Sequence, residues 1–350
     1  MNKDVPGGSS GPAARPPTMA DVARRAEVGK QTVSNALNKP ELLRPETLAR
    51  VKAAIEELGY RPHIAARSLR RRESRTIGFA LERSVAGRSN AVNDRFLHAL
   101  AAAAGYRLLV FSVDSREQEI ERYDELLGEQ AVDAFVLDRT ATDDPRHRWL
   151  HDRSVPFAAF GRSWSDEDFG DWVDVDGAAG IEAATEHMVA AGHRKIGLLG
   201  WPAGSGTGDD RTQGWRRTMK RHGLSVRGLT AAAANRPDAA RRAASTLLDK
   251  GVSAIVAVSD ALALGCYDAL RERGQRPGTD IAVTGFDDSP FAELLDPPLT
   301  SVEQPLEEAA TECVRMLVER IADPGRPYGQ RLLTPRLVVR DSSGPAAAGA

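Results

Sequence analysis

Apolar residues repeat with the period of an α-helix in the first part of the chain and as short strand-like runs beyond residue 76. Up to residue 60 the pattern predicts three helices, which begin at Met19, near Lys30 and at Pro45. The third helix has an apolar stripe at Leu48, Val51, Ile55 and Leu58. The first two helices are too short to be stable alone, so we expect all three to share one small core.

The ends of these helices contain residues that favour helix boundaries. Thr18 and Asp21 have the spacing of a capping box, with Asp in place of the usual Glu or Gln. Pro45 suits a first helical position, and Gly59 suits a C-terminal stop. Residues 27–29 are predicted to form a tight turn, so the first two helices form a helix-turn-helix.

The second predicted helix has a polar face for which the chain offers no obvious partner. Packing of its apolar side on the first helix leaves five polar residues facing outward, Lys30, Gln31, Ser34, Asn35 and Asn38. Gln and Asn can bond bidentately to adenine in the major groove, and Lys can reach phosphate or guanine. The motif alone fits a solvated helix of a small bundle equally well.

Residues 61–75 are predicted to be a basic segment with a short helix after Pro62. A helix of about two turns is marginal unless a partner stabilises it. Ala66 is small enough for close approach to another surface, and Leu69 is a lone large apolar residue among arginines. An apolar wedge between arginines suits the DNA minor groove. A flexible basic linker is compatible with this interpretation, because the segment could be disordered when free and helical on DNA.

Beyond Thr76, short apolar runs alternate with amphipathic stretches, and the runs include TIGFAL, YRLLVF, DAFVLD, PFAAFGR, WVDVD, KIGLLG, SAIVAVSD and DIAVTGFDD. This alternation predicts an α/β fold with parallel sheets and helices on both faces. The runs are too many for one modest sheet, so we expect two similar lobes. Ligands of such sheets bind at the carboxyl ends of the strands.

The net charge of −2 conceals an uneven distribution. Residues 15–75, called the head below, contain 14 Lys or Arg against 7 Asp or Glu. Residues 76–350, called the body, contain 32 basic against 41 acidic residues. A basic head on an acidic body suggests that the head meets a polyanion and the body does not.

Cysteine usage and the absence of apolar segments indicate the compartment. Two widely spaced cysteines, Cys266 and Cys313, indicate a reducing environment without a disulfide framework. Residues 1–17 have no signal-peptide core, and no run of about 18 apolar residues is present. We therefore expect a cytoplasmic protein without membrane contact, with disordered tails at both ends.

The run TMADVARRAEVGKQTVSNALNKPELLRPETLARVKAAIEELGYRPHIAARSLRRR resembles the DNA-binding head of the LacI/GalR family of bacterial repressors. The pieces D-V-A, T-V-S, A-L-N, L-G-Y-R-P and A-A-R-S-L-R fall in register. In that family the second helix reads the major groove, and a hinge helix inserts its Leu at the centre of a palindrome. The resemblance implies bases for Lys30, Gln31 and Asn35. It implies DNA backbone for Thr18, Thr32 and Ser34, close approach for Ala66 and the wedge role for Leu69.

Three positions depart from the family pattern. Glu27 stands where the family usually has Gly, and Gly29 stands where it usually has Ser or Thr. Gly29 can cap a helix but lacks a hydroxyl for phosphate. Asn35 stands where Arg or His is common. We interpret these departures as altered operator preference or weaker affinity, with DNA binding retained.

The body is similar, over essentially all of 76–340, to the periplasmic-sugar-binding-protein fold that the family uses, with a ligand between the lobes. GDDRTQGW resembles the motif D-R-x-x-G-[FW] and implies that Arg211 binds the effector. VAVSDALALG implies a hydroxyl acceptor at Asp260, and GFDDSP implies a wall residue at Phe286. FGRS and the nearby Trp164 suggest Arg162 and Trp164 as further effector contacts. Arg211 as a surface residue and Asp260 as a helix cap are the simpler alternatives.

The expected boundaries follow from the pattern and the resemblance together. We expect two tails (1–17 and 341–350), a helix-turn-helix domain (18–60), a hinge helix and linker (61–75), and a two-lobed effector-binding and dimerisation domain (76–340). The first lobe is expected at about 76–165 plus 303–328, and the second at about 166–302 plus 329–340.

Other functions find less support in the sequence. The loop GSGTG lacks the GKS or GKT ending of a phosphate loop, no GxSxG elbow exists, and the seven histidines show no HExxH spacing. A transport binding protein would not have the basic head. The resemblance implies a homodimeric repressor, tetramer not excluded, without cofactor or metal. It would bind a palindromic operator in double-stranded DNA and respond to a sugar or glycoside inducer, with a purine or other co-repressor as the alternative.

Overall fold

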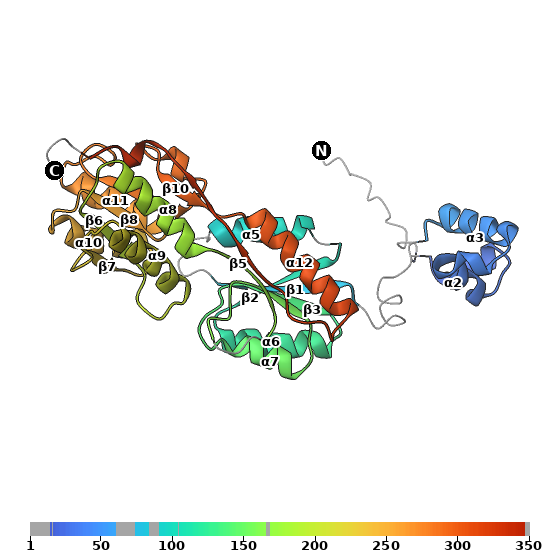
Figure 1. Cartoon of the computed structure of the whole chain (residues 1–350). Helices are drawn as coiled ribbons and strands as arrows, with labels where there is room; N and C mark the ends of the chain where they lie inside the picture. The colour runs from blue at the N-terminus through green and yellow to red at the C-terminus, as the bar shows by residue number, and fades with distance from the viewer. Residues whose placement is uncertain are drawn as a thin grey trace, which may run out of the picture. The chain divides into compact units, whose positions relative to one another are not determined.

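The computed structural model describes residue 15 and residues 17–60, 74–83, 91–103, 105–165 and 169–346. The chain divides into two compact units, Met1–Ser74 and Arg75–Ala350. The first unit contains the three helices of the head, and the second contains the two-lobed body (Figure 1). Ala66 and Leu69, the expected minor-groove contacts, lie outside the described residues.

The head contains the predicted helix-turn-helix. Its elements are α1 (Met19–Arg25), α2 (Lys30–Asn38), the 3₁₀ turn η1 (Pro40–Leu42) and α3 (Pro45–Leu58). The capping box is present, because the amide and hydroxyl of Thr18 both donate to Asp21 Oδ2, at 2.8 and 2.6 Å. Gly59 ends α3 in the left-handed conformation, with φ of 61°. The buried residues of this core are Val22, Ala23, Ala26, Val33, Ala36, Val51, Ala54 and Tyr60.

The first lobe of the body, lobe 1, is built on a six-stranded parallel sheet with the order β11-β5-β4-β3-β1-β2. Its strands are β1 (Thr76–Glu82), β2 (Arg107–Val113), β3 (Ala134–Leu137), β4 (Phe157–Phe160), β5 (Asp171–Val175) and β11 (Gln330–Leu333). Its helices are α5 (Ala91–Ala103), α6 (Arg116–Gly128), α7 (Pro145–Asp152) and α12 (Leu306–Ala322). Helices α5 and α12 cover one face, and α6 and α7 cover the other (Figure 1).

The second lobe, lobe 2, repeats this plan with the order β12-β10-β9-β8-β6-β7, in which only β12 is antiparallel. Its strands are β6 (Ile196–Gly200), β7 (Thr230–Ala232), β8 (Ala254–Ala257), β9 (Ala282–Asp287), β10 (Thr300–Glu303) and β12 (Arg336–Val338). Its helices are α8 (Gly177–Ala190), α9 (Thr207–Arg221), α10 (Pro237–Leu248) and α11 (Asp260–Glu272), with short 3₁₀ turns η3 (Ala292–Leu294) and η4 (Asp341–Ser343).

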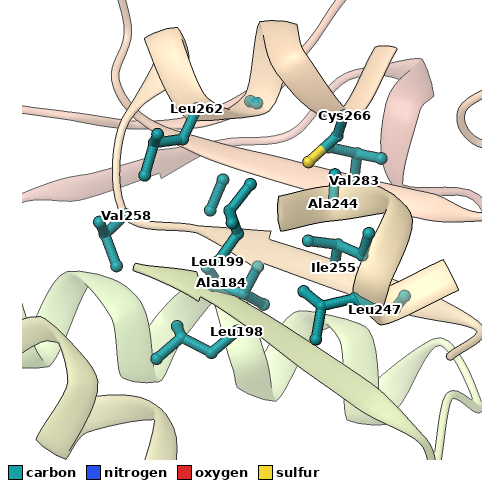
Figure 2. Packing of buried hydrophobic residues seen from close by; sticks show 14 of the residues in the cluster. Ala184, Leu198, Leu199, Ala244, Leu247, Ile255, Val258, Leu262, Cys266 and Val283 are labelled. Atoms are coloured by element: carbon teal, nitrogen blue, oxygen red, sulfur yellow. The ribbon is translucent and has the colours of Figure 1, made fainter. Parts of the chain in front are cut away.

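The buried residues of lobe 2 form one continuous apolar cluster, whereas those of lobe 1 form two. In Figure 2 Ala244 and Leu247 of α10 and Cys266 of α11 pack against strand residues such as Ile255 and Val283. Trp215 of α9 is fully buried in the same cluster. Among the described residues, no helix is long and apolar enough to cross a membrane.

The lobe boundaries differ from the expected ones at two strands. The segments 171–175 and 330–333 were expected in lobe 2, but β5 and β11 complete the sheet of lobe 1. Buried ion pairs hold this edge together, because Asp171 of β5 bonds to Arg320 at 3.0 Å and to Arg326 at 2.9 Å. An apolar run identifies a strand but does not say which sheet it joins. The chain therefore crosses between lobes after Val175, between Glu303 and Leu306, and after Leu333.

The expected disordered tail from residue 341 is also wrong as far as residue 346. Ser342 is fully buried, and its hydroxyl donates to Val283 O at 2.7 Å and accepts from Thr300 N at 2.8 Å. A ring nitrogen of His193 lies 3.0 Å from Gly344 O. Composition could not reveal this, because the small polar residues of the tail complete hydrogen bonds of lobe 2. Residues 347–350 lie outside the described ranges.

Candidate DNA-binding face and effector site

Helix α2 presents a row of amide side chains that the head's core does not need. Lys30 and Gln31 are exposed, and Thr32 and Asn35 are partly exposed. Gln31 Nε2 donates to Asn35 Oδ1 at 3.1 Å, one helical turn away. This exposed bond joins only the two side chains. Both amides can therefore give it up and bond to base edges instead, without disturbing the core.

Three of the residues expected to face outward or to contact DNA make contacts within the head. Ser34 is only 5% exposed, because its place beside Val33 puts it at the edge of the face that packs on α1 and α3. It is therefore not an outward-facing polar residue, as the pattern suggested. The Thr18 hydroxyl donates to Asp21, so its hydrogen is already used in the capping box. Asn38 donates to Ser34 O at 2.8 Å and closes the last turn of the helix.

The turn between the two helices explains the first departure from the family pattern. Glu27 has a φ of 54°, which is the left-handed conformation that glycine adopts most easily. The turn therefore keeps the expected backbone geometry without a glycine. A left-handed residue with a side chain costs about 1–2 kcal/mol, so the head is less stable here than a glycine turn would make it.

In lobe 2, Arg211 lies near the start of α9, at the carboxyl ends of several strands. Its side chain is 4% exposed and rests on the ring of Phe286, with its guanidinium carbon 3.6 Å from the ring centroid. Nη1 donates to Val258 O at 2.5 Å, and the nearest carboxylate, Asp287, is 3.9 Å away. Nε has no hydrogen-bond partner among the described residues. Burial lowers the pKa of Arg211, with Asp287 opposing that shift.

Asp260 is fully buried and hydrogen-bonded within lobe 2. Its oxygens accept from Ser289 N at 2.6 Å and from Ser301 Oγ at 2.5 Å. The helix cap of α11 is Ser259, whose hydroxyl accepts from Leu262 N, so Asp260 is not the cap. Burial and the neighbouring Asp287 raise the pKa of Asp260. The carboxyl group therefore braces β10 and the loop after β9.

Asp287 is not among the residues predicted to bind the effector, yet its Oδ1 lies 3.9 Å from Arg211 Nη1. Its Oδ1 accepts from Gln304 Nε2 at 2.7 Å, at the second crossing between lobes. Burial raises the pKa of Asp287, and Arg211 opposes that shift. The signal was present in GFDDSP, where Asp287 directly follows Phe286 at the end of β9. The centroid of the Trp201 ring lies 5.2 Å from the Arg211 guanidinium.

The two candidates from lobe 1 contact lobe 2. Arg162 Nε donates to Asp174 Oδ2 at 2.7 Å within lobe 1, and Nη2 donates to Asp210 Oδ2 at 3.1 Å in lobe 2. The Arg162 guanidinium lies 4.2 Å from the ring centroid of Trp164. The Trp164 ring packs against Gly206, in the loop before α9. Arg162 and Trp164 therefore contact each other, and Arg162 bonds to Asp210, which directly precedes Arg211. Arg211 and Phe286 contact each other within lobe 2, whereas the bonds of Asp260 go to Ser289 and Ser301.

The described residues contain no group of three or more His, Cys, Asp or Glu side chains arranged to hold a metal ion.

Known proteins resemble this chain over most of its length. The family model described as bacterial regulatory proteins, lacI family, matches residues 18–63, and that of a periplasmic binding protein-like domain matches residues 185–343. The chain is 33% identical to the HTH-type transcriptional regulator CelR of Thermobifida fusca, over 94% of this chain and 98% of CelR. The chain belongs to the LacI family. It is also 31% identical to the ribose operon repressor of Escherichia coli (strain K12), over 93% and 99% of the two chains.

Solved structures of the LacI family agree with the fold. A complex of a transcriptional regulator CelR with cellobiose has a TM-score of 0.71 at 31% identity, covering 93% of this chain and 99% of that one. The lac repressor dimer bound to operator and the anti-inducer ONPF has a TM-score of 0.81 at 26% identity, covering 94% and 100%. The predicted fold class is therefore confirmed, and the chain is a DNA-binding transcriptional regulator and not an enzyme.

Proposed function

We propose that this regulator is a cytoplasmic repressor that binds a palindromic operator as a homodimer. Its operator affinity is controlled by a sugar or glycoside bound where the lobes meet. The observation that carries the proposal is the exposed amide pair of α2, Gln31 and Asn35, on a helix-turn-helix whose core does not use it. The family relatives that bind an operator and sugar-like ligands support both halves of the proposal.

On DNA, Lys30, Gln31 and Asn35 face base edges in the major groove, where amides suit adenine and Lys suits guanine or phosphate. Thr18 and Thr32, at the starts of α1 and α2, lie near the DNA phosphates. Ser34 contacts the DNA backbone only through the small part of its surface that is exposed. Ala66 allows the hinge to approach the minor groove, and Leu69 parts a base step there. Arginines of the hinge make the affinity fall steeply with salt.

In the body, the effector contacts Arg211 through the Nε donor that has no partner among the described residues. The fork of an Arg side chain suits hydroxyl oxygens of a sugar, and Asp287 supplies an acceptor close to it. Phe286 and Trp201 form the apolar wall beside the guanidinium. Asp260 acts indirectly, by bracing the loop that holds Asp287. Arg162 and Trp164 approach the same region from lobe 1.

Selection of full-length protein against a random duplex library tests the DNA half of the proposal. We expect enrichment of a palindrome with a central pyrimidine–purine step, since such steps deform most easily. A variant with Gln31→Ala and Asn35→Ala should lose that enrichment while its thermal unfolding is unchanged. Enrichment of an asymmetric site would contradict the dimer, and equal enrichment by the variant would contradict base reading by α2.

The same selection repeated with added ligands tests the effector half. Cellobiose, ribose or another neutral sugar that reduces retention of the selected duplex supports induction by a sugar. A purine that increases retention supports the co-repressor alternative instead. If neither the sugars nor the purines change retention of the duplex, control of operator binding by these ligand classes is contradicted.

A further inference from the structure

Arg162 connects carboxylates that belong to different lobes. It follows β4 of lobe 1 and bonds to Asp174 of the same lobe at 2.7 Å and to Asp210 of lobe 2 at 3.1 Å. The three side chains are 23%, 11% and 19% exposed, so water screens this bridge less than it screens a surface pair. The Arg162 guanidinium therefore joins the two lobes. Both of its carboxylate partners belong to the protein, so it needs no ligand to balance its charge.

The bridge lies beside the first crossing of the chain between lobes. Asp174 is part of β5, which ends at Val175, and α8 begins at Gly177. Asp210 Oδ2 also accepts from Ala178 N at 3.0 Å, so it is anchored to the first turn of α8. Rotation of the lobes about this crossing would separate Arg162 from Asp210 while leaving Arg162 bonded to Asp174. The Arg162–Asp210 contact is thus the part of the bridge that depends on closure.

Trp164 makes a second contact across the same boundary. A Cβ atom built at Gly206 of lobe 2 would lie 2.6 Å from Trp164 Cγ, so the ring fits only because position 206 is glycine. Trp164 itself has a φ of 55°, an unfavourable backbone conformation for so large a residue. Such strain persists where surrounding contacts hold it. Here those contacts are the Arg162 guanidinium and the backbone of the facing lobe.

We propose that Arg162, Trp164, Gly206 and Asp210 form an interlobe latch that holds the lobes closed in the absence of effector. In this role Arg162 is a positioning residue and not a direct effector ligand. A consequence for ligand binding rests on the proposed function. An effector that binds only the closed form does not have to close the lobes itself while the latch is intact. Its apparent affinity then falls when the latch is weakened, because a smaller fraction of the protein is competent to bind.

Distance measurement between spin labels on the full-length protein tests the latch without any effector. Labels at Asp124→Cys on lobe 1 and Lys220→Cys on lobe 2 use exposed sites, and native Cys266 and Cys313 are fully buried. Labelled chains are diluted with unlabelled ones, so that each proposed dimer has one labelled subunit, and we then expect one narrow distance distribution for the otherwise unchanged protein. Arg162→Met and Asp210→Asn should each shift it to longer distances and broaden it. The Asn side chain keeps an oxygen that can accept from Ala178 N, so Asp210→Asn removes the charge and preserves that local bond.

Three further variants test whether the effect is specific to the latch. Arg276→Met removes an arginine from the exposed pair with Asp296, which lies within lobe 2, and should leave the distribution unchanged. The double variant Arg162→Met with Asp210→Asn should match the single variants, because both single changes remove the same ion pair. An additive shift would mean that the two residues act independently, which would overturn the pairing. Gly206→Ala should also open the lobes if the Trp164 contact is part of the latch.

A distribution that stays the same in Arg162→Met and Asp210→Asn would overturn the latch. That result would leave the proposed sugar effector untouched, because the distance is measured without ligand. Conversely, a protein that opens on latch mutation but responds to no sugar would retain the latch and contradict the proposed effector. Thermal unfolding of each variant, compared with Arg276→Met, confirms that opening is not unfolding.

Discussion

Arg146 of lobe 1 and Arg211 of lobe 2 are both buried, but their surroundings differ. Arg146 of lobe 1 bonds through Nε and Nη2 to Asp144, through Nη1 to both oxygens of Glu119 at 3.0 Å, and through Nη2 to Asp138 O. Burial alone would lower the pKa of Arg146, but Asp144 and Glu119 raise it above its usual value. Arg211 of lobe 2 has a lowered pKa and an Nε without a partner among the described residues.

This difference distinguishes a structural arginine from one available to a ligand. The charge of Arg146 is matched by two carboxylates and its donors are used, so lobe 1 depends on it for stability. The carboxylate that faces Arg211 is more distant, because Oδ1 of Asp287 lies 3.9 Å from Nη1 of Arg211. A buried donor without a partner is unfavourable for folding, and the proposed effector would give Nε of Arg211 a partner. The same residue type at similar burial thus serves different purposes.

The largest effect is expected from Arg146→Met. Removal of the guanidinium leaves Glu119 and Asp144 buried without a cation, and such breakage costs roughly 3–5 kcal/mol. The variant should therefore unfold at a clearly lower denaturant concentration than wild type. A midpoint that does not move would show that the network contributes little and would remove the contrast with Arg211.

A pH-dependent loss of stability is expected from His147, which lies next to Arg146 in α7 and is also buried. Burial lowers the pKa of His147 to about 4, from an ordinary value of 6.5. Between these values the unfolded chain binds a proton that the native chain does not, so stability falls as pH falls through that window. At pH 4.5 the loss is roughly 2–3 kcal/mol. His147→Gln should make the free energy of unfolding less dependent on pH between 6.5 and 4.5. An unchanged dependence would show that the lowered pKa of His147 does not cause the loss.

Arg211→Met should change stability far less than Arg146→Met, by roughly 1 kcal/mol or less in either direction. The reason is that replacing a poorly paired buried charge with an apolar side chain removes an unfavourable group. Denaturant unfolding of the two variants side by side measures the difference. Equal destabilisation would mean that Arg211 is structural after all.

The sequence could locate Arg211 but not Arg146, and the reason is physical. Arg211 lies in a local motif, D-R-x-x-G-W, whose register with a family is visible along the chain. Arg146 is defined by Glu119, 27 positions earlier, which comes close only when α6 and α7 pack together. The same limit applies to β5 and β11, whose sheet is chosen by pairing with distant strands. Helix ends such as Thr18 and Gly59 were predictable because caps are local.

The smallest effect on stability is expected in the head, which extends the comparison to exposed side chains. Asn35→Ala removes an exposed hydrogen bond to Gln31, so its unfolding should stay within roughly 0.5 kcal/mol of wild type. Its affinity for the selected operator should nevertheless fall by roughly 1–3 kcal/mol, the worth of one bidentate base contact. Fluorescence anisotropy with the selected duplex measures this loss. A variant that binds as tightly as wild type would exclude Asn35 from base reading.

Thermal unfolding of wild type, Arg211→Met and Arg146→Met against a panel of neutral sugars that includes cellobiose and ribose tests the central claim most directly. A ligand that binds the native state raises the unfolding temperature, and the stabilisation grows with the logarithm of one plus the ratio of ligand concentration to Kd. We expect at least one sugar to stabilise wild type and the already weakened Arg146→Met, but not Arg211→Met. A sugar that stabilises Arg211→Met as strongly as wild type, or a panel in which no sugar stabilises wild type, would contradict it.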